Sequence, residues 1–452
     1  MTLLNELSAE VCQRARMSRD PRFDGRFFVA VKTTGIFCRP ICPANLPKEE
    51  NVEYFSSQAL AVSAGYRPCL RCRPESAPHS WAWKGAETTF LRALTLIEQG
   101  ELDGSLETLA SRLGISDRYL RQLFQRHLGM PPKQYAQIQQ LMFAKQLLHT
   151  SQISITEVAY ASGFQSTRRF NDAFQKLFRL TPTQVRRERA ALPSRNHLSL
   201  AFRGPFDWAH MLDFYRLRAI EGMELVDEQS YQRHFVLGEG TGWFKASMAQ
   251  SHLDIEFEME RLSDLRHLVA RLRRMFDLDA DLISIEAHLE QLAPGLVRRT
   301  GIRIPGVWNA WEAGVRAVLG QQVSVKAAIG QLNLLVSTLA ASEGSTRYFP
   351  TPEQVQMSDL SFLRMPERRK ETLKRLADYV RLHPMDSPMA WLSLSGIGPW
   401  TVDYAQLRGE SRSHCFLIGD LIVKKALAKF PQLTAESVAP WGSYATFHCW
   451  SH

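Results

Sequence analysis

The sequence predicts a multidomain, mainly α-helical protein with α+β parts, and three observations lead to that expectation. The chain has 452 residues, more than one hydrophobic core normally serves. Two cysteine pairs lie near its start, an internal repeat of helical period follows, and a glycine-containing hairpin interrupts a helical final third. We therefore expect a small α/β domain at residues 1–78, a tandem helix-turn-helix domain at 85–188, an α+β domain at 198–290 and an all-α domain at 291–452.

The composition is that of a basic globular protein. Hydrophobic residues make up 45% of the chain and charged residues 22%, and the formal net charge is +9. This balance favours a polyanionic partner such as DNA. The N-terminal segment "MTLLNELSAEVCQRARMSRD" lacks the apolar stretch of a signal peptide, and the chain has no apolar run long enough to span a bilayer. We therefore predict a cytoplasmic, nucleoid-associated protein that does not enter membranes.

Four of the seven cysteines form two close pairs. Cys38 and Cys42 have three residues between them, and Cys69 and Cys72 have two. These spacings suit one tetrahedral Zn²⁺ ion better than a disulfide framework. From spacing alone, a zinc ion that only stabilises a small fold is the more common outcome, and a reactive sulfur is the alternative.

The residues around these pairs, "FVAVKTTGIFCRPICPANL" and "YRPCLRCRPE", resemble the N-terminal domain of the Ada methylation-response protein over residues 8–76. The resemblance implies that the four cysteines hold zinc and that Cys38 also accepts a methyl group, irreversibly, from a DNA methylphosphotriester. Zinc keeps a thiol deprotonated, and the thiolate is the nucleophile. Because methylation removes one negative charge from the site, it should tighten binding to DNA. Arg39 flanks the cysteines, and we expect it to contact phosphate.

The tandem domain is indicated by self-similarity. Ala110 and Gly114 recur 49 residues later as Ala159 and Gly163, and each copy is typical of a helix, a glycine-containing turn and a second, basic helix. We expect linkers on either side of the domain, "PESAPHSWAWKG" before it and "RRERAALPSRNH" after it.

The second copy contains "Gly-Phe" in its turn and closes with "FQKLFRLTP", and the region resembles the AraC/XylS-type DNA-binding domain. Residues 81–190 hold 15 Lys and Arg against 9 Asp and Glu, a net charge of +6. The second helix of each copy is expected to enter a major groove. The basic side chains predicted to contact DNA there are Arg118, Arg121, Arg168 and Arg169.

The segment "LSGIGPWTVDY" has the Gly-x-Gly form of a helix-hairpin-helix. Gly396 and Gly398 let backbone amides approach a DNA phosphate at a helix N-terminus. With Asp420 downstream and "GVWNAWEAGVRAVLGQQVSVKAA" upstream, residues 198–452 resemble the AlkA-like branch of the helix-hairpin-helix DNA glycosylases. The resemblance implies that Asp420 is catalytic, and a carboxylate stabilises the oxocarbenium charge that grows as the base leaves. A helix N-cap before "LIVKKAL" is the alternative role of Asp420, and the two roles are compatible.

The same resemblance assigns further residues. Trp400 lies where lyase-type members carry a Schiff-base lysine, so hydrolysis by water without a lyase step is expected. Gln322, in "GQQVS", lies where the residue that fills the duplex after base flipping is expected, although some members have leucine there. A monovalent cation at the hairpin is also implied. The aromatic base pocket of the family falls on Trp400, Tyr404, Trp450 and Phe214.

These parts together predict DNA alkylation repair and its regulation. Methyl transfer to Cys38 would activate sequence-specific DNA binding and transcription, and Asp420 would support excision of 3-methyladenine-type bases. The expected partners are alkylated and promoter double-stranded DNA and RNA polymerase, and a monomer is expected. Two alternatives stay open: a transcription activator with an inert glycosylase half, and a glycosylase whose zinc is purely structural.

Overall fold

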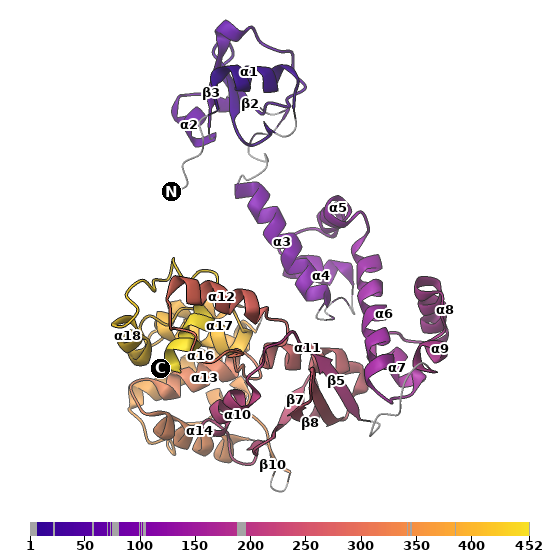
Figure 1. Ribbon diagram of the computed structural model, residues 1–452, viewed down its shortest axis with the longest axis vertical. Coiled ribbons are helices and arrows are strands. Elements are labelled where there is room, and N and C mark those ends of the chain that lie inside the picture. The colour runs from indigo at the N-terminus through magenta and orange to yellow at the C-terminus, as the bar shows by residue number, and fades with distance from the viewer. Residues whose placement is uncertain are drawn as a thin grey trace. The chain divides into compact units, whose positions relative to one another are not determined.

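The computed structural model describes residues 7–20, 23–56, 58–69, 71–72, 74, 81–98, 100, 102, 105–187, 196–340, 342–343, 346–384 and 386–451 (Figure 1). The chain divides into two compact units, Met1–Gln139 and Gln140–His452, and each is described by itself. Within the described ranges, no helix combines the length and apolarity that crossing a bilayer requires.

The N-terminal part of the first unit is a four-stranded sheet of order β3-β1-β2-β4, in which β2 and β4 are parallel and the other pairs antiparallel. Alternate residues of β1 face opposite sides: Val29 packs with Cys12 of α1, and Phe28 and Ala30 pack with Phe37. Both clusters are small, so a bound metal has much to contribute to stability. The elements are α1 (Ala9–Met17), β1 (Phe28–Val31), β2 (Ile36–Cys38), β3 (Val52–Phe55), α2 (Gln58–Ser63) and β4 (Arg67–Pro68).

The helical segment that follows contains α3 (Trp81–Glu98), α4 (Leu106–Arg112), α5 (Asp117–Leu128) and α6 (Pro132–Thr150). The linker expected through Gly85 was wrong for residues 81–85, which belong to α3, whereas residues 75–80 lie outside the described part. The proline and serine residues that suggested a linker end at Ser80, before the helix begins.

The second copy of the repeat comprises α7 (Ile155–Ala161) and α8 (Thr167–Phe178), followed by α9 (Pro182–Arg187). Serine side chains cap both helices of each copy, because a hydroxyl accepts from the free N–H groups of a first helical turn. The linker expected after α9 falls largely on residues 188–195, outside the described residues. The caps are Ser105 and Ser116 in the first copy and Ser154 and Ser166 in the second.

An antiparallel five-stranded sheet of order β5-β9-β8-β7-β6 begins the remainder of the second unit. The long strands alternate buried residues with intermediate or exposed ones, so one face packs on a core that includes α11. The elements are β5 (His197–Ala201), α10 (Trp208–Arg216), β6 (Glu224–Val226), β7 (Ser230–Leu237), β8 (Gly240–Met248), β9 (His252–Met259) and α11 (Leu265–Met275).

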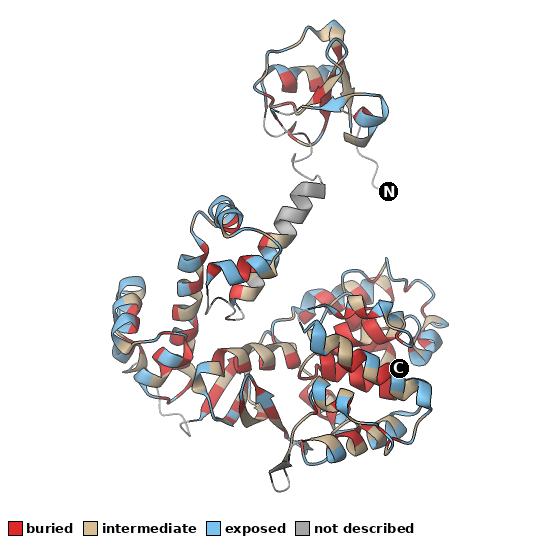
Figure 2. Ribbon diagram, turned by 180° about the vertical axis from the view of Figure 1, so that it is seen from behind, coloured by how far each residue is buried: buried red, intermediate tan, exposed pale blue. Residues whose placement is uncertain are grey.

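The C-terminal part is helical around α13, whose residues Trp311–Leu319 are all buried (Figure 2). Gly409 of α17 allows close packing, since a Cβ there would lie 2.5 Å from the Cα atom of Ala310. A two-stranded ladder interrupts the otherwise all-α pattern that was expected. The elements are α12 (Leu282–Leu292), α13 (Ala310–Gly320), α14 (Val325–Leu339), β10 (Ser342–Glu343), β11 (Thr346–Arg347), α15 (Pro352–Met357), α16 (Glu367–Leu382), η5 (Pro388–Ser393), α17 (Pro399–Glu410), α18 (Leu421–Leu427) and α19 (Gly442–Trp450).

A buried ion network joins the sheet to α13. Arg233 of β7 contacts Glu312 at 2.5 Å and Glu224 at 2.9 Å, and Arg316 contacts the same two carboxylates at 2.9 and 3.2 Å. Although burial opposes its charge, the two arginines hold the pKa of Glu312 down to about 2. Removing one member would leave an uncompensated buried charge, so the network fixes where α13 meets β7.

Candidate functional site

The four paired cysteines meet at one point. Cys38 ends β2 and Cys69 follows β4, and the parallel pairing of these strands brings the two cysteine pairs together. The four Sγ atoms lie within 4.8 Å of one another. A Zn–S distance of about 2.3 Å implies sulfur–sulfur separations of about 3.8 Å, so small adjustments place all four around one ion. Thiolate ligands in this number and geometry fit zinc.

Backbone and side-chain groups support this cluster. The Arg39 amide donates to Cys72 Sγ at 3.4 Å, as expected for a sulfur that carries negative charge. Within the cluster of four thiols, a hydrogen bond between Cys38 and Cys72 lowers the pKa of Cys72 to about 6 and raises the pKa of Cys38. A cation held by all four sulfurs would replace this shared proton.

Arg39 is held inside the domain. Its guanidinium makes a two-point ion pair with Asp24, with Nε to Oδ1 at 2.8 Å, and also donates to the Cys72 carbonyl at 3.3 Å. Its side chain is 18% exposed. The pair positions the loop between Cys38 and Cys42, and the phosphate contact that the sequence suggested for Arg39 stays a prediction.

The four arginines predicted to contact DNA are exposed on the second helix of each repeat copy. Arg118 and Arg121 lie on α5, where Arg121 pairs with Asp117 at 2.9 Å. Arg168 and Arg169 lie on the first turn of α8. The apolar face of each helix is buried in its own core, which leaves these cations on the solvent side.

The hairpin lies between η5 and α17. Gly396 has φ of +94°, and a Cβ there would meet Thr372 Oγ1 at 2.1 Å, so glycine is required. Gly398 is the N-cap of α17 and Pro399 is its first residue. The free N–H groups of that first turn, together with the helix dipole, form a site for a phosphate.

The turn before α14 is tied to this hairpin. Gln321 Nε2 donates to the Gly396 carbonyl at 3.1 Å and to Thr401 Oγ1 at 3.2 Å. The adjacent Gln322 is exposed and has φ of +57°, a left-handed backbone conformation that is uncommon outside glycine. Sequence reasoning did not single out Gln321, whose two hydrogen bonds tie this turn to the hairpin.

The predicted aromatic residues line one cavity of about 510 Å³ in the second unit. Trp400 stacks on Tyr404 with ring centroids 5.3 Å apart, and Phe214 stacks on Trp450 at 6.3 Å. They come from α17, α10 and α19, which the chain brings together across more than two hundred residues. Aromatic rings that line a cavity can stack on a flat base.

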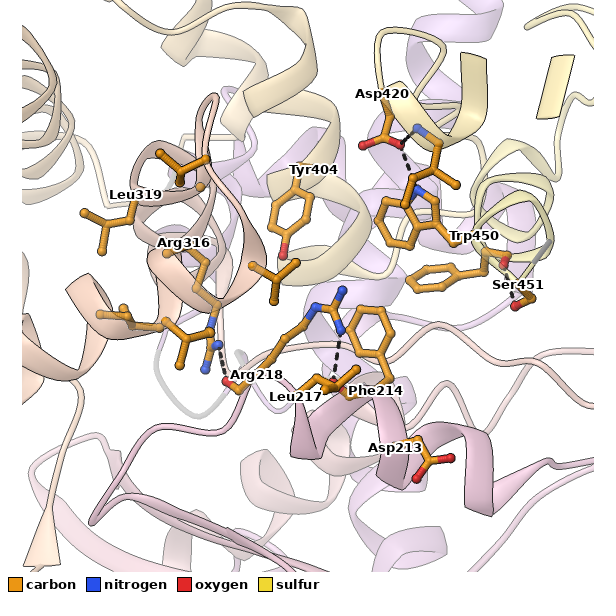
Figure 3. A pocket seen from close by; sticks show the side chains of 18 of the residues that line it. Asp213, Phe214, Leu217, Arg218, Arg316, Leu319, Tyr404, Asp420, Trp450 and Ser451 are labelled. Carbon is orange, nitrogen blue, oxygen red and sulfur yellow. Dashed lines mark hydrogen bonds between the residues drawn. The ribbon is translucent and has the colours of Figure 1, made fainter. Parts of the chain in front are cut away.

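Asp420 faces the same cavity from the start of α18 (Figure 3). It is the N-cap of that helix: Oδ1 accepts from the amides of Ile422 at 2.9 Å and Val423 at 3.2 Å. The same oxygen accepts from Trp450 Nε1 at 3.1 Å. Within the described residues Oδ2 has no hydrogen-bond donor, so one oxygen is fixed and the other is available to a reacting sugar or water.

Sequence reasoning missed two arginines that contact Phe214: Arg218, which lines the cavity, and Arg408, which is buried. The Arg218 guanidinium lies 3.7 Å from the Phe214 ring centroid, and that of Arg408 lies 4.7 Å from it. Arg408 also donates to the Tyr404 hydroxyl at 3.0 Å. Burial lowers the pKa of Arg218 to about 10. Arg218 follows Phe214 by four residues, but α10 ends at Arg216, so helical spacing alone would not have placed Arg218 beside that ring.

Three family models match successive parts of the chain. They are the metal binding domain of Ada at residues 11–75, a helix-turn-helix domain at 109–188 and the AlkA N-terminal domain at 197–309. These matches confirm the predicted multidomain fold class, and the first of them, with the four clustered cysteines, confirms zinc as the metal.

Similar proteins align with the whole chain or with part of it. One from Mycobacterium tuberculosis, a "Probable bifunctional transcriptional activator/DNA repair enzyme AlkA", is 34% identical over 98% of this chain and 96% of its own. DNA-3-methyladenine glycosylase 2 of Escherichia coli is 33% identical over 56% of this chain and 96% of its own. The "Bifunctional transcriptional activator/DNA repair enzyme Ada" of E. coli is 35% identical over 38% of this chain and 47% of its own.

Proposed function

Since the chain belongs to the family of bifunctional transcriptional activator/DNA repair proteins that join Ada-type and AlkA-type parts, we propose that it excises alkylated bases at Asp420 and senses alkylated DNA at Cys38. The four regions expected from the sequence then divide three tasks: methyl acceptance, sequence-specific binding and, shared by the last two, base excision. DNA is the common partner of all four.

The observation that carries the glycosylase proposal is the pairing of Asp420 with the aromatic cavity. A base between the stacked rings would bring its deoxyribose towards Oδ2, where a carboxylate stabilises the positive charge that develops as the N-glycosidic bond breaks. An alkylated purine carries positive charge, so it leaves as a neutral base without acid catalysis, and π faces attract it. Water completes the hydrolysis, and Trp400 in place of a lysine is the reason to expect no Schiff base.

The hairpin and the Gln322 turn support flipping of the base. The N–H groups at Gly398 would grip one phosphate, and Gln322 would occupy the space that the flipped base vacates. The tie from Gln321 to Gly396 couples these two contacts. A monovalent cation at the hairpin remains part of this proposal.

The sensor proposal rests on the cysteine cluster. Cys38 is half-buried, whereas Cys42 and Cys72 are 7% and 9% exposed, so Cys38 is more open to a substrate than those two sulfurs. Transfer forms an S–CH₃ bond at Cys38 as the phosphate O–CH₃ bond breaks, and the phosphate oxygen keeps the electron pair. The zinc site then loses one negative charge, which favours promoter binding through α5 and α8. We further propose that the protein acts as a monomer in the cytoplasm with RNA polymerase.

Two measurements test these proposals. Asp420→Asn should reduce release of 3-methyladenine from methylated DNA by at least about 100-fold with unchanged melting temperature; equal release by both proteins contradicts the catalytic role. Intact-mass and peptide mass spectrometry after exposure to methylated DNA should show one methyl group on Cys38. A protein that stays unmethylated has a purely structural zinc.

A further inference from the structure

Arg218 brings an uncompensated positive charge into the base cavity. Its hydrogen bond goes to the Phe214 carbonyl at 3.3 Å, and within the described residues it has no carboxylate partner. Asp213, which also lines the cavity, pairs with Arg216 at 2.5 Å and points away from Arg218 (Figure 3). The remaining N–H groups of Arg218 are therefore available to a ligand in the cavity.

The charged groups near Arg218 do not supply a carboxylate partner for it. Arg316 is satisfied by Glu312 and Glu224, while Arg408 donates to the Pro305 carbonyl and the Tyr404 hydroxyl. The nearby groups thus leave the Arg218 side of the cavity positive. Asp420 faces the cavity from a different element, the start of α18.

The positive charge of Arg218 and the negative charge of Asp420 can act on different fragments of the reacting nucleotide. When the glycosidic bond breaks, its electron pair stays with the base. A cationic alkylated purine becomes neutral, whereas an uncharged base becomes an anion and takes a proton from water afterwards. A fixed guanidinium stabilises such an anion in a water-poor cavity and repels a cationic base before the bond breaks.

We infer that Arg218 broadens base specificity: it assists the departure of uncharged, carbonyl-bearing bases and offsets part of the preference for cationic bases that the aromatic rings create. This inference rests on the proposed glycosylase function. The N–H groups of Arg218 donate to the carbonyl edge of the base, and Asp420 acts on the sugar. The guanidinium thus stabilises the departing base, and the carboxylate stabilises the cationic sugar.

The test compares two lesions in one duplex sequence, hypoxanthine and 7-methylguanine. Both carry a carbonyl at position 6, but only 7-methylguanine is cationic. Single-turnover release is measured for the full-length wild type, Arg218→Gln and Arg218→Lys. Arg216→Gln is the matched control, because Arg216 lies on the same segment but is exposed and paired with Asp213.

Arg218→Gln should reduce the rate on hypoxanthine by roughly 10- to 100-fold and leave the rate on 7-methylguanine unchanged or higher. Arg218→Lys should keep the ratio of the two rates within about tenfold of wild type, since it keeps the positive charge. Equal losses on both lesions, or an equal change of ratio in Arg216→Gln, would overturn the inference. If the wild type releases neither base, the proposed glycosylase function itself fails.

Discussion

Replacing Trp450 with Phe tests whether the position of Asp420 matters for its chemistry. The indole Nε1 donates to Asp420 Oδ1 at 3.1 Å, and the ring packs on Phe214 and Phe447. Phenylalanine keeps an aromatic ring in place and removes the donor. Oδ1 then retains the two amides of α18, and the carboxylate is free to rotate about them.

The expected loss follows from the strength of that bond. A hydrogen bond to a charged group contributes about 1.5–3 kcal/mol, which corresponds to roughly a 10- to 150-fold fall in kcat if the orientation is needed in the transition state. The assay is single-turnover release of 3-methyladenine at saturating enzyme. Trp441→Phe is the control, since Trp441 packs on the same core but is not a donor to Asp420. Equal rates for wild type and Trp450→Phe would refute the reasoning, and equal losses in both variants would attribute the effect to packing.

Three further outcomes follow from other parts of the structure. Gly396→Ala should lose more than about 1 kcal/mol of unfolding free energy by thermal melting, because its Cβ would lie 2.1 Å from Thr372 Oγ1. Gly398→Ala should keep its melting temperature and bind duplex DNA more weakly, since Gly398 has φ of −107° and nothing lies within 4 Å of a Cβ there; the reverse order would contradict the hairpin geometry. Cys42→Ser should lose zinc by native mass spectrometry, whereas Cys12→Ser, which replaces a buried cysteine outside the cluster, should retain it; zinc loss in both would discredit the ligand set. Burial raises the pKa of Asp277 to about 7, so above about pH 4 the folded state keeps a proton that the unfolded chain has lost, and the stability of the fold decreases as the pH rises towards 7. Asp277→Asn should therefore raise the melting temperature more at pH 8 than at pH 5. Replacing the exposed Asp279 with Asn should change the melting temperature equally at both pH values.

Features set by neighbours in the chain were predictable from the sequence. The cysteine pairs are short enough that each is a local ligand pair, and zinc follows from their number. The repeat was visible because both copies need the same buried positions and the same glycine at the turn, Gly114 and Gly163, which have φ of +69° and +85°. The strands at 230–259 followed from alternation, since only one face of that sheet is buried.

Features set by partners distant in the chain were not predictable. Arg39 pairs with Asp24, and Arg233 pairs with Glu312, 79 residues away. A basic side chain in a sequence gives no sign of which carboxylate neutralises it, so the charge state of a surface or cavity cannot be read from charge counts. Arg218 illustrates the converse, because the role proposed for it rests on the lack of a carboxylate partner among the residues that the structure describes.

Asp420 shows how a structural role and the proposed catalytic role can share one side chain. As a residue type before "LIVKKAL", aspartate is explained fully by capping, and capping alone predicts that Asn or Ser would serve as well. The structure separates the two oxygens: Oδ1 accepts from two helix amides and the Trp450 indole, whereas within the described residues Oδ2 has no hydrogen-bond donor. The cap is therefore what orients the second oxygen, since a carboxylate fixed at one oxygen by three donors has little freedom at the other. Asn at this position would keep the cap and lose the charge, which is why Asp420→Asn isolates catalysis from stability.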